Sequence, residues 1–349
     1  MKKLLVLILG IGSFAGIQGC SEDFKVAAPY KDISFVSGFL NMRDTAHYIR
    51  IQKAFLDESL SAIDMAKVAD SSFFNQLEVV MKEVQGSNVI NTIPLMRVDM
   101  TNEGYPKQSG AFFNAPNYAY KFKKALNPSL KYRLVITHTN TGNIDSSEIN
   151  IIDTSALTVT DMFSNSFRVN FARSRPADKY KYQLIVTGNS SMKYYQGVVT
   201  FHWLERNSLT GAESRKSAEF TVESKAAPGA LNTFPLETEN IRFYSFLSDA
   251  MRPAEPGVER YMDSCDVYVY AAGVDFFNYM ITNSVQSGGI TADQAKPLYT
   301  NIRGKDVYGL FTTRTERFRL NVPLDSVTLD SIRVHPVTQS LNVKGFTTN

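Results

Sequence analysis

The chain is dominated by short segments in which apolar and polar residues alternate, the pattern of half-buried β-strands. In segment 33–55, two apolar runs flank the polar stretch 41–45, and the second run alternates, which predicts a β-hairpin. Strand patterns resume at 77–84 and 92–100. Residues 57–74 have apolar side chains near helical spacing instead, so we expect a short helix or a loop insertion there.

The segment 118–152 has the clearest strand pattern of the chain. One strand ends at Leu126, Asn127-Pro128 forms a turn, and alternation resumes at Tyr132. This leucine, turn and tyrosine resemble the corner of immunoglobulin-like sandwiches, in which a tyrosine hydroxyl bonds back to the backbone of the corner. We therefore interpret Tyr132 as a residue of the architecture rather than of a site.

The second half begins after a stretch of Ser, Thr and Asp without a clear period at 153–165, where we place a domain boundary. Strands are expected at 167–173 and 180–188, followed by a long hairpin with its turn at 207–214. A further strand is expected at 265–272.

One segment of the second half predicts a helix and another is ambiguous. Segment 274–289 has helical spacing and ends at Gly288, a C-terminal stop signal. Four apolar side chains share its stripe: Phe277, Met280, Ile281 and Val285. Segment 240–249 fits both a strand and a helix, and we assign it to a strand. Strand patterns return from residue 306 to the C-terminus.

These segments predict a mainly β protein of two domains. Residues 30–155 are expected to form an immunoglobulin-like β-sandwich, because short strands and turns follow each other closely there. Residues 156–349 are expected to form a second β-rich domain with one helix. The chain is long enough for two domains, each with a core of its own.

The N-terminus carries the features of an export signal. Lys2 and Lys3 precede an apolar run at 4–9, which is too short to span a membrane. The sequence IQGC, ending at Cys20, resembles a bacterial lipobox. That resemblance implies cleavage of a signal peptide at 1–19 and attachment of palmitate and other acyl chains to Cys20, since one chain alone holds a protein only marginally. The alternative is a secreted protein with an incidental cysteine.

The residues behind the cysteine refine the expected location. Ser21, Glu22 and Asp23 resemble the acidic signal that sends lipoproteins of Bacteroidota to the outer face of the outer membrane. We interpret 20–29 as a tether. The expected location is the outer membrane, lipid-anchored and exposed at the cell surface, with the periplasmic face as the alternative.

Charge and cysteine content exclude some classes of protein. The formal net charge is +3, of which Lys2 and Lys3 contribute two, so the mature chain is nearly neutral. A nucleic-acid partner is therefore not expected, because such binding needs a basic face. Cys265 is the only other cysteine. With Cys20 lipidated no disulfide can form within the chain, and we expect Cys265 to be a buried, inert thiol.

The final third resembles a family. FLSDAM at 246–251 is followed by VYVYAAGVDFFNYM at 267–280 and KPLYTNIRGKDVYGLFTTRT at 296–315. This order is similar to a Bacteroidota lipoprotein family of unknown function with a C-terminal Pro…Tyr-Asn-Ile…Gly-x-Gly-Ile-Phe-like signature. Six residues fill the matching positions: Pro297, Asn301, Ile302, Gly304, Gly309 and Phe311. The usual compact glycine spacing is stretched here by residues 305–308.

That resemblance spans most of the mature chain and implies an outer-membrane lipoprotein, often encoded beside a TonB-dependent receptor. It implies no catalytic residues. In physical terms, the glycines of NIRGKDVYGLF are expected to permit a turn that locks one strand onto the next.

No motif in the chain requires a metal, a cofactor or a catalytic residue, and we predict none. The four histidines are scattered singly, and there is no His-Glu-x-x-His, no Gly-x-Ser-x-Gly and no EF-hand loop. Carboxylates for glycoside hydrolysis would come from separate strands and cannot be paired from the sequence. A hydrolase with unassigned carboxylates is therefore the third function we consider.

Two groups of residues are candidate sites. Trp203, Tyr194 and Tyr195 could stack on a sugar or a peptide, or could belong to the core. Three Asp-(Ser/Thr) sequences resemble an O-glycosylation acceptor of Bacteroidota, or are polar turns; their acceptor residues are Thr45, Ser326 and Ser331. Thr45 is the best candidate, because we expect it in an exposed hairpin turn.

The expected function is non-catalytic: a binding or accessory subunit at the cell surface that works with a TonB-dependent transporter. The second expectation is an adhesion or envelope-structural protein, because sandwich domains commonly serve as interaction modules. The ligand remains unknown at this stage.

Overall fold

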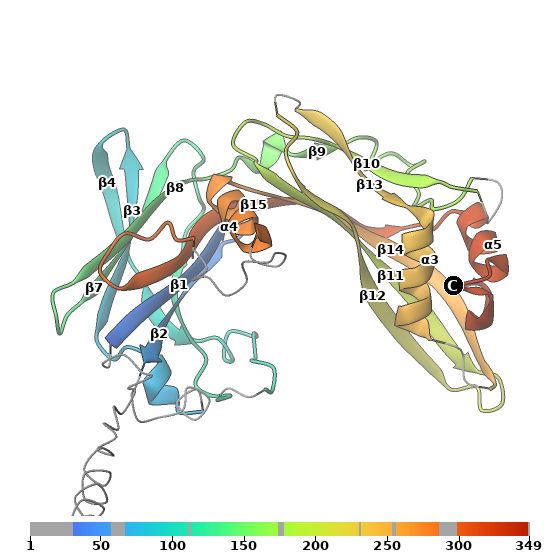
Figure 1. The fold of residues 1–349 in the computed structure, drawn as a ribbon, viewed down its shortest axis with the longest axis horizontal. Coiled ribbons are helices and arrows are strands. Elements are labelled where there is room, and N and C mark those ends of the chain that lie inside the picture. The colour runs from blue at the N-terminus through green and yellow to red at the C-terminus, as the bar shows by residue number, and fades with distance from the viewer. Residues whose placement is uncertain are drawn as a thin grey trace, which may run out of the picture.

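The computed structural model describes residues 31–56, 67–110, 113–173, 178–229, 232–252, 256–285 and 299–347. The predicted signal peptide, the tether, Cys20 and Ser21–Asp23 lie outside these residues. Figure 1 shows two lobes joined by long strands, with an open space between them on one side. We call the lobe that contains the first strands the N-lobe and the other the C-lobe.

Most of the described chain is strand, as predicted. The strands are β1 (Lys31–Asn41), β2 (Ala46–Leu56), β3 (Leu77–Gln85), β4 (Asn88–Pro94), β5 (Met96–Asp99), β6 (Tyr118–Lys123), β7 (Lys131–His138), β8 (Ile144–Asn150), β9 (Thr158–Val159), β10 (Lys181–Thr187), β11 (Tyr194–Asn207), β12 (Glu213–Ala226), β13 (Thr233–Glu239), β14 (Val258–Ala272), β15 (Val307–Val322) and β16 (Val343–Phe346). The helices are α3 (Asn240–Met251), α4 (Val274–Val285) and α5 (Ser326–Val334), with 3₁₀ turns at Ala69–Ser72, Thr154–Ala156 and Gln339–Leu341.

A nine-stranded sheet runs through both lobes in the order β12-β11-β14-β15-β1-β2-β6-β5, with β16 paired to β14. In the N-lobe a four-stranded sheet, β4-β3-β7-β8, packs against it. In the C-lobe a three-stranded sheet, β13-β10-β9, and the helices α3 and α5 cover one face. Each lobe is therefore a sandwich, and the nine-stranded sheet is the layer that they share (Figure 1).

The N-lobe confirms the predicted sandwich. β1 and β2 form the hairpin expected at 33–55, with antiparallel register. Its buried face carries apolar residues at every second position, including Val36, Leu40, Ile49 and Ile51. These pack on Tyr132 and its neighbours from the opposite sheet, as the alternation requires.

The predicted tyrosine corner is present. The Tyr132 hydroxyl accepts a hydrogen bond from the backbone N–H of Asn127 at 2.9 Å and donates to Glu83 Oε1 at 3.1 Å. Burial raises the pKa of Tyr132 to about 12, so the hydroxyl keeps its proton. Burial alone would raise the pKa of Glu83, but hydrogen bonds from Lys124, Asn91 and Tyr132 outweigh it and hold that pKa below its usual value. Tyr132 is an architectural residue, as interpreted.

This corner predicts a pH-dependent loss of stability. We expect Tyr132→Phe to lower the free energy of unfolding by about 1–3 kcal/mol near neutral pH, because Asn127 N–H and Glu83 lose a partner. The pKa of Glu83 is lower in the folded than in the unfolded state, so its contribution is complete above pH 4.5 and is lost as the pH falls through the folded value. The free energy of unfolding of Tyr132→Phe should therefore approach that of the wild type at acid pH.

Urea unfolding of both proteins at neutral and acid pH measures this difference. Tyr308→Phe, on the exposed side of β15, is the control and should behave as the wild type at both pH values. A deficit of Tyr132→Phe that is equal at both pH values would contradict the role given to the charged Glu83.

The C-lobe encloses a core rich in aromatic side chains. The ring of Phe171 stacks on Phe243 at a centroid distance of 4.1 Å and lies 4.5 Å from Tyr182. Phe201 of β11 and Phe220 of β12 close this cluster from the large sheet. The lobe is therefore held together by contacts between aromatic rings of both layers.

Two segments expected to be strands are helices. Segment 240–249 lies in α3, whose buried residues Phe243, Tyr244, Leu247 and Met251 follow helical spacing. The region after residue 306 also contains α5, in which Asp325 caps the first turn by accepting the N–H of Val327 at 2.9 Å. The expectation of one helix was therefore wrong: the described residues contain three.

The helix expected at 274–289 is confirmed as α4 over the part that is described, while Gly288 lies outside. Its contacts differ from the predicted stripe. Phe276, one position before Phe277, packs edge-on against Phe39 and Tyr194, whereas Ile281 is 46% exposed. α4 is thus a helix at the lobe junction and not a core helix (Figure 1).

The two cores draw on different parts of the chain, with one exchange. The C-lobe core takes its residues from Ile152 onward. The N-lobe core takes its residues from 36–151 and, in addition, Ile302, Val307 and Phe311. These three belong to a segment, 301–311, that we call the latch. The second half of the chain therefore completes the first lobe.

Side chain and backbone bonds hold the latch in place. The Asn301 amide donates to the carbonyl of Phe311 at 2.6 Å and accepts from its N–H at 2.9 Å, so it pairs with β15 as a strand would. Arg303 and Ser146 exchange two backbone hydrogen bonds, at 2.8 and 2.7 Å, which adds the latch to the edge of β8.

Two glycines of the latch permit close approach. A Cβ at Gly304 would lie 2.0 Å from Asp145 Oδ1, and one at Gly309 would lie 1.9 Å from the carbonyl oxygen of Val36. Gly309 also has φ +138°, which side-chain-bearing residues rarely adopt. Gly309 lies within β15 and allows its close approach to β1, whereas the sequence predicted a turn between successive strands; Pro297 lies outside the described residues.

Candidate functional site

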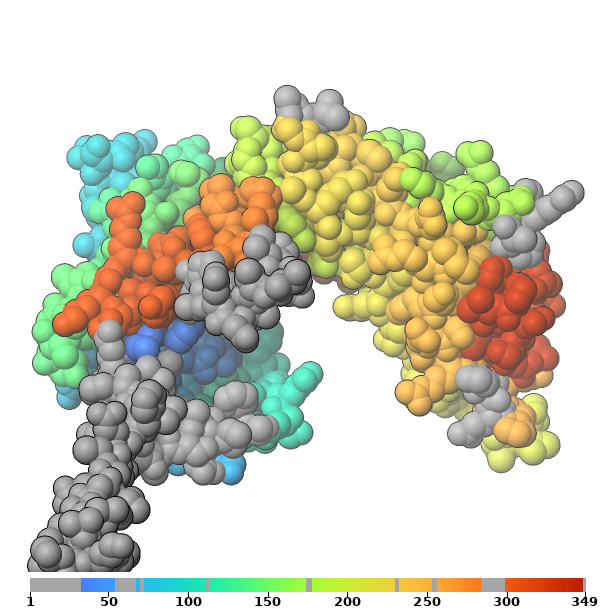
Figure 2. Space-filling view, in the orientation of Figure 1, coloured from blue at the N-terminus to red at the C-terminus, as the bar shows by residue number. Residues whose placement is uncertain are grey.

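One face of the nine-stranded sheet is left open across the junction of the lobes. On β1 and β15 the open side carries Phe39 and Arg314, while Leu40 and Phe311 face the core. On the C-lobe strands it carries Tyr268, Tyr270 and Phe318; the ring of Tyr268 lies 5.9 Å from that of Tyr270 and 5.7 Å from that of Phe318. In the space-filling view a deep notch separates the two lobes (Figure 2).

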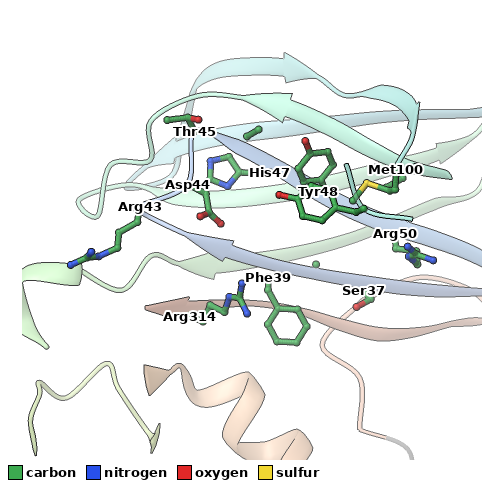
Figure 3. A pocket seen from close by; sticks show the side chains of 14 residues that line it. Ser37, Phe39, Arg43, Asp44, Thr45, His47, Tyr48, Arg50, Met100 and Arg314 are labelled. Atoms are coloured by element: carbon green, nitrogen blue, oxygen red, sulfur yellow. The ribbon is translucent and has the colours of Figure 1, made fainter. Parts of the chain in front are cut away.

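A polar hollow of about 610 Å³ lies on the N-lobe side of this face. Figure 3 shows Asp44 and His47, near the start of β2, across from Phe39 and Arg314. Arg50 forms the far end of the hollow. We call this the arginine hollow, because Arg43, Arg50 and Arg314 line it and Asp44 is its single acidic residue.

The electrostatics of the arginine hollow favour an anion. Burial lowers the pKa of His47, partly offset by the carbonyl of Lys124 and by Asp44, so the ring is neutral at pH 7. Among the described residues, none of the salt bridges involves Arg43, Arg50 or Arg314. Three arginines and one aspartate therefore line the hollow, which gives it an excess of positive charge.

An apolar hollow of about 440 Å³ lies on the C-lobe side and shares Phe39 and Arg314 with the first. Phe276 of α4 packs edge-on against Phe39 at 5.9 Å and against Tyr194 at 5.6 Å. The remaining lining residues are Gln196, Ser224, Tyr270, Ala271, Ala272 and Met280. We call this the aromatic hollow, and the two hollows together the junction groove.

The comparison with protein families places the chain. Residues 32–318 match the domain of unknown function DUF4249. This chain belongs to the DUF4249 family. The match spans both lobes, includes the latch, and contains every residue that lines the junction groove. α5 and β16 follow the matched residues.

Other comparisons add little to the DUF4249 match. No curated protein matches the chain. The C-terminal globular domain of an oligosaccharyltransferase from Pyrococcus abyssi aligns at 11% identity with a TM-score of 0.24, over 66% of this chain and 44% of that one. A structure of CBD12 from CALX1.2 aligns at 8% identity with a TM-score of 0.17, over 82% and 100% of the two chains. The first alignment thus spans less than half of the structure that it matches.

The predicted stacking residues of this DUF4249 chain separate into core and groove. Trp203 is 4% exposed and its indole N–H donates to Glu205 at 3.3 Å; Tyr195 is 2% exposed and packs on Phe234. Both belong to the C-lobe core, so the stacking interpretation was wrong for them: on β11 their side of the strand faces the second layer. Tyr194, on the other side, lines the aromatic hollow.

The three predicted glycosylation acceptors lie in different surroundings. Thr45 is exposed in the β1–β2 turn, as expected, and lines the arginine hollow. Ser326 is exposed at the start of α5. Ser331 is 3% exposed on the inner side of α5, so its interpretation as a turn residue was wrong and a glycosyl group would not fit in the folded state.

Two arrangements resemble catalytic groups without having their geometry. His138 Nε2 lies 2.9 Å from Asp145 Oδ2 and 3.5 Å from Ser34 Oγ, all buried. A nucleophile relay needs the nucleophile and the orienting acid on opposite nitrogens of the histidine base, whereas here Ser34 and Asp145 both contact Nε2. Cys265 is fully buried, and burial raises the pKa of its thiol, as expected of an inert cysteine.

A third hollow, of about 650 Å³, brings two carboxylates together, those of Glu148 and Asp275. Burial would raise the pKa of Glu148, but Arg133 and Lys131 outweigh it and hold that pKa below its usual value. A general acid for glycoside hydrolysis needs the opposite shift. Within the described ranges, no three His, Cys, Asp or Glu residues are placed to hold a metal ion, and no helix is long and apolar enough to cross a membrane.

Sequence reasoning missed most of the groove. Phe39, Arg314 and Phe276 are far apart in the chain, and the parallel pairing of β1 with β15 brings the first two together. The alternation in β14 and β15 did carry a signal, since Tyr268, Tyr270 and Phe318 fall on the side opposite the core residues. That signal indicates an aromatic sheet face, and it does not indicate the partner strand.

Proposed function

We propose that this protein is a lipid-anchored outer-membrane lipoprotein that binds a ligand without catalysis and works as an accessory subunit of a TonB-dependent transporter. The observation that carries the binding function is the junction groove: two adjoining hollows, open to the surface, whose lining comes from both lobes. Ligand sites occur preferentially where such units meet. The sequence around Cys20 and the resemblance to Bacteroidota lipoproteins support the anchor and the transporter.

The proposed mechanism is capture and hand-over. Cys20 precedes the start of β1 at Lys31 by eleven residues. A segment of that length reaches at most about 40 Å when fully extended. The anchor would therefore keep the groove close to the membrane and raise the effective concentration of the bound ligand beside the transporter. Ser21, Glu22 and Asp23 favour the cell-surface face in this proposal.

Adhesion is the second candidate, and the edge strand β4 favours it. β4 carries no charged residue, and Val89 and Ile90 are 45% and 52% exposed. Edge strands of monomeric proteins are usually blocked by charges or bulges, because a free edge can pair with another chain.

An affinity purification tests the transporter partnership. The tagged lipoprotein would be purified from gently solubilised outer membranes of its own host, with a known complex followed as a control for the detergent. We expect a TonB-dependent barrel in stoichiometric amount. A lipoprotein recovered alone, while the control complex survives, would contradict the proposal and favour adhesion.

Substitution of the anchoring cysteine gives a sharper prediction. Cys20→Ser should abolish labelling by radioactive palmitate and move the protein from the membrane fraction to the soluble fraction, because the thioether cannot form. Cys265→Ala is the matched control and should keep the label, since the buried Cys265 is not a lipid acceptor. Undiminished labelling of Cys20→Ser would show that the lipobox interpretation is incorrect.

A further inference from the structure

We propose that the junction groove binds an amphipathic organic anion, whose apolar body fills the aromatic hollow and whose carboxylate or phosphate group meets the guanidinium groups of the arginine hollow. This inference rests on the proposed binding function and adds the chemical class of the ligand.

The aromatic hollow selects an apolar body. The rings of Phe39 and Tyr194 both contact Phe276 edge-on, and Ala271 and Ala272 add further apolar surface to the lining. The Gln196 amide donates to Ser224 at 3.0 Å, and the phenol groups of Tyr194 and Tyr270 and the guanidinium of Arg314 are the other polar groups of the lining. Aromatic rings and aliphatic carbons make up the rest, so an aryl or alkyl group would displace water from apolar surface there.

The arginine hollow selects a negative charge. Arg314 lines both hollows, and its guanidinium extends toward Asp44 across the arginine hollow without an ion pair between them (Figure 3). Arg43 is exposed and lies over the ring of Phe318 at 5.7 Å, whereas Arg50 is half-buried. Guanidinium groups bind carboxylates and phosphates through paired hydrogen bonds.

The shared residues fix where the two parts of the ligand meet. Because Phe39 and Arg314 line both hollows, the apolar part and the anionic group must be adjacent in one molecule. The hollows of about 440 and 610 Å³ suit a small molecule rather than a folded partner.

Calorimetric titration of the full mature chain tests the proposal with four probes: 4-phenylbutyrate, 4-phenylbutyl phosphate, 4-phenylbutan-1-ol and butyrate. We expect the two phenyl anions to bind, and the neutral alcohol and the butyrate without a ring to bind at least about tenfold more weakly. The phenyl anion that binds more tightly identifies whether the groove prefers a carboxylate or a phosphate headgroup. Binding of the alcohol equal to that of the anions, or no binding of any probe at millimolar concentration, would overturn the proposal.

Two variants place the binding in the groove. Arg314→Gln should weaken both phenyl anions about tenfold and leave the alcohol unchanged, because it removes a charged donor. Arg333→Gln on α5 is the matched control and should change nothing, since Arg333 lies outside the groove and pairs with Asp330. Equal affinity of wild type and Arg314→Gln would overturn the assignment. The purification above is independent: a co-purifying barrel with no probe binding refutes the ligand class alone.

Discussion

Arg260→Met is expected to lower the free energy of unfolding by about 3–5 kcal/mol, because the change removes the charged partner of the partly buried Glu205 carboxylate and the only side-chain donor shown for three backbone carbonyl groups. Arg260 of β14 is 4% exposed. Its Nε donates to Glu205 at 2.8 Å, and its other two nitrogens donate to the carbonyls of Met251, Arg252 and Leu341 at 2.9 to 3.0 Å. One side chain thus joins the end of α3, the sheet and the C-terminal turn.

The carbonyls explain why a methionine of similar length cannot substitute. Those of Met251 and Arg252 lie at the C-terminus of α3, where backbone carbonyls have no partner within the helix. The positive charge also lies at the negative end of the helix dipole. Burial would raise the pKa of Glu205, but hydrogen bonds from Arg260 and Trp203 outweigh it and hold that pKa below its usual value. In the variant the Glu205 carboxylate loses its charged partner and keeps only the hydrogen bond from Trp203.

Tryptophan fluorescence during urea unfolding measures the effect, because the single tryptophan, Trp203, is bonded to Glu205 in the C-lobe core. Arg215→Met is the matched control. Arg215 pairs with Asp263 but is 73% exposed at its side chain, so its removal should cost less than about 1 kcal/mol. Equal stability of the two variants would show that the Arg260 network contributes no more than a surface pair.

The contrast between these two arginines illustrates what the sequence could predict. The strand alternation predicted the β1–β2 hairpin and the N-lobe sandwich, and a local turn motif predicted the hydrogen bond between the Tyr132 hydroxyl and the corner's backbone, which the Asn127 N–H donates. These features depend on neighbours along the chain. Nothing local distinguishes the buried Arg260 from the exposed Arg215, because burial depends on where α3 and the C-terminal turn come to lie.

The same limit applies to the helices and to the groove. Segment 240–249 is rich in Phe and Tyr, which strands favour, and its helical form depends on packing Phe243 and Leu247 against the sheet. The groove depends on pairing of β1 with β15 across most of the chain. Trp203 shows the converse error: an aromatic residue suggested a binding surface, and only the second layer of the C-lobe shows that it is core.

Gly309→Ala is the second change for which we expect a large effect, because the long-range pairing of β1 with β15 depends on the absence of a side chain there. The added Cβ would lie 1.9 Å from the carbonyl oxygen of Val36 and 2.7 Å from its nitrogen and carbonyl carbon, all backbone atoms of the paired strand. The backbone at φ +138° adds conformational strain. Together these should lower the free energy of unfolding by about 3 kcal/mol or more.

The loss should be confined to the N-lobe, since the latch residues Ile302, Val307 and Phe311 belong to its core while Trp203 lies in the other. Circular dichroism should therefore show an unfolding transition at lower urea than the fluorescence of Trp203. Gly345→Ala in β16 is the control, because a Cβ there meets nothing within 4 Å, and it should shift stability by about 1 kcal/mol at most. Coincident transitions in Gly309→Ala would instead mean that the shared sheet couples the lobes into one cooperative unit, so that the contact made by one glycine stabilises both.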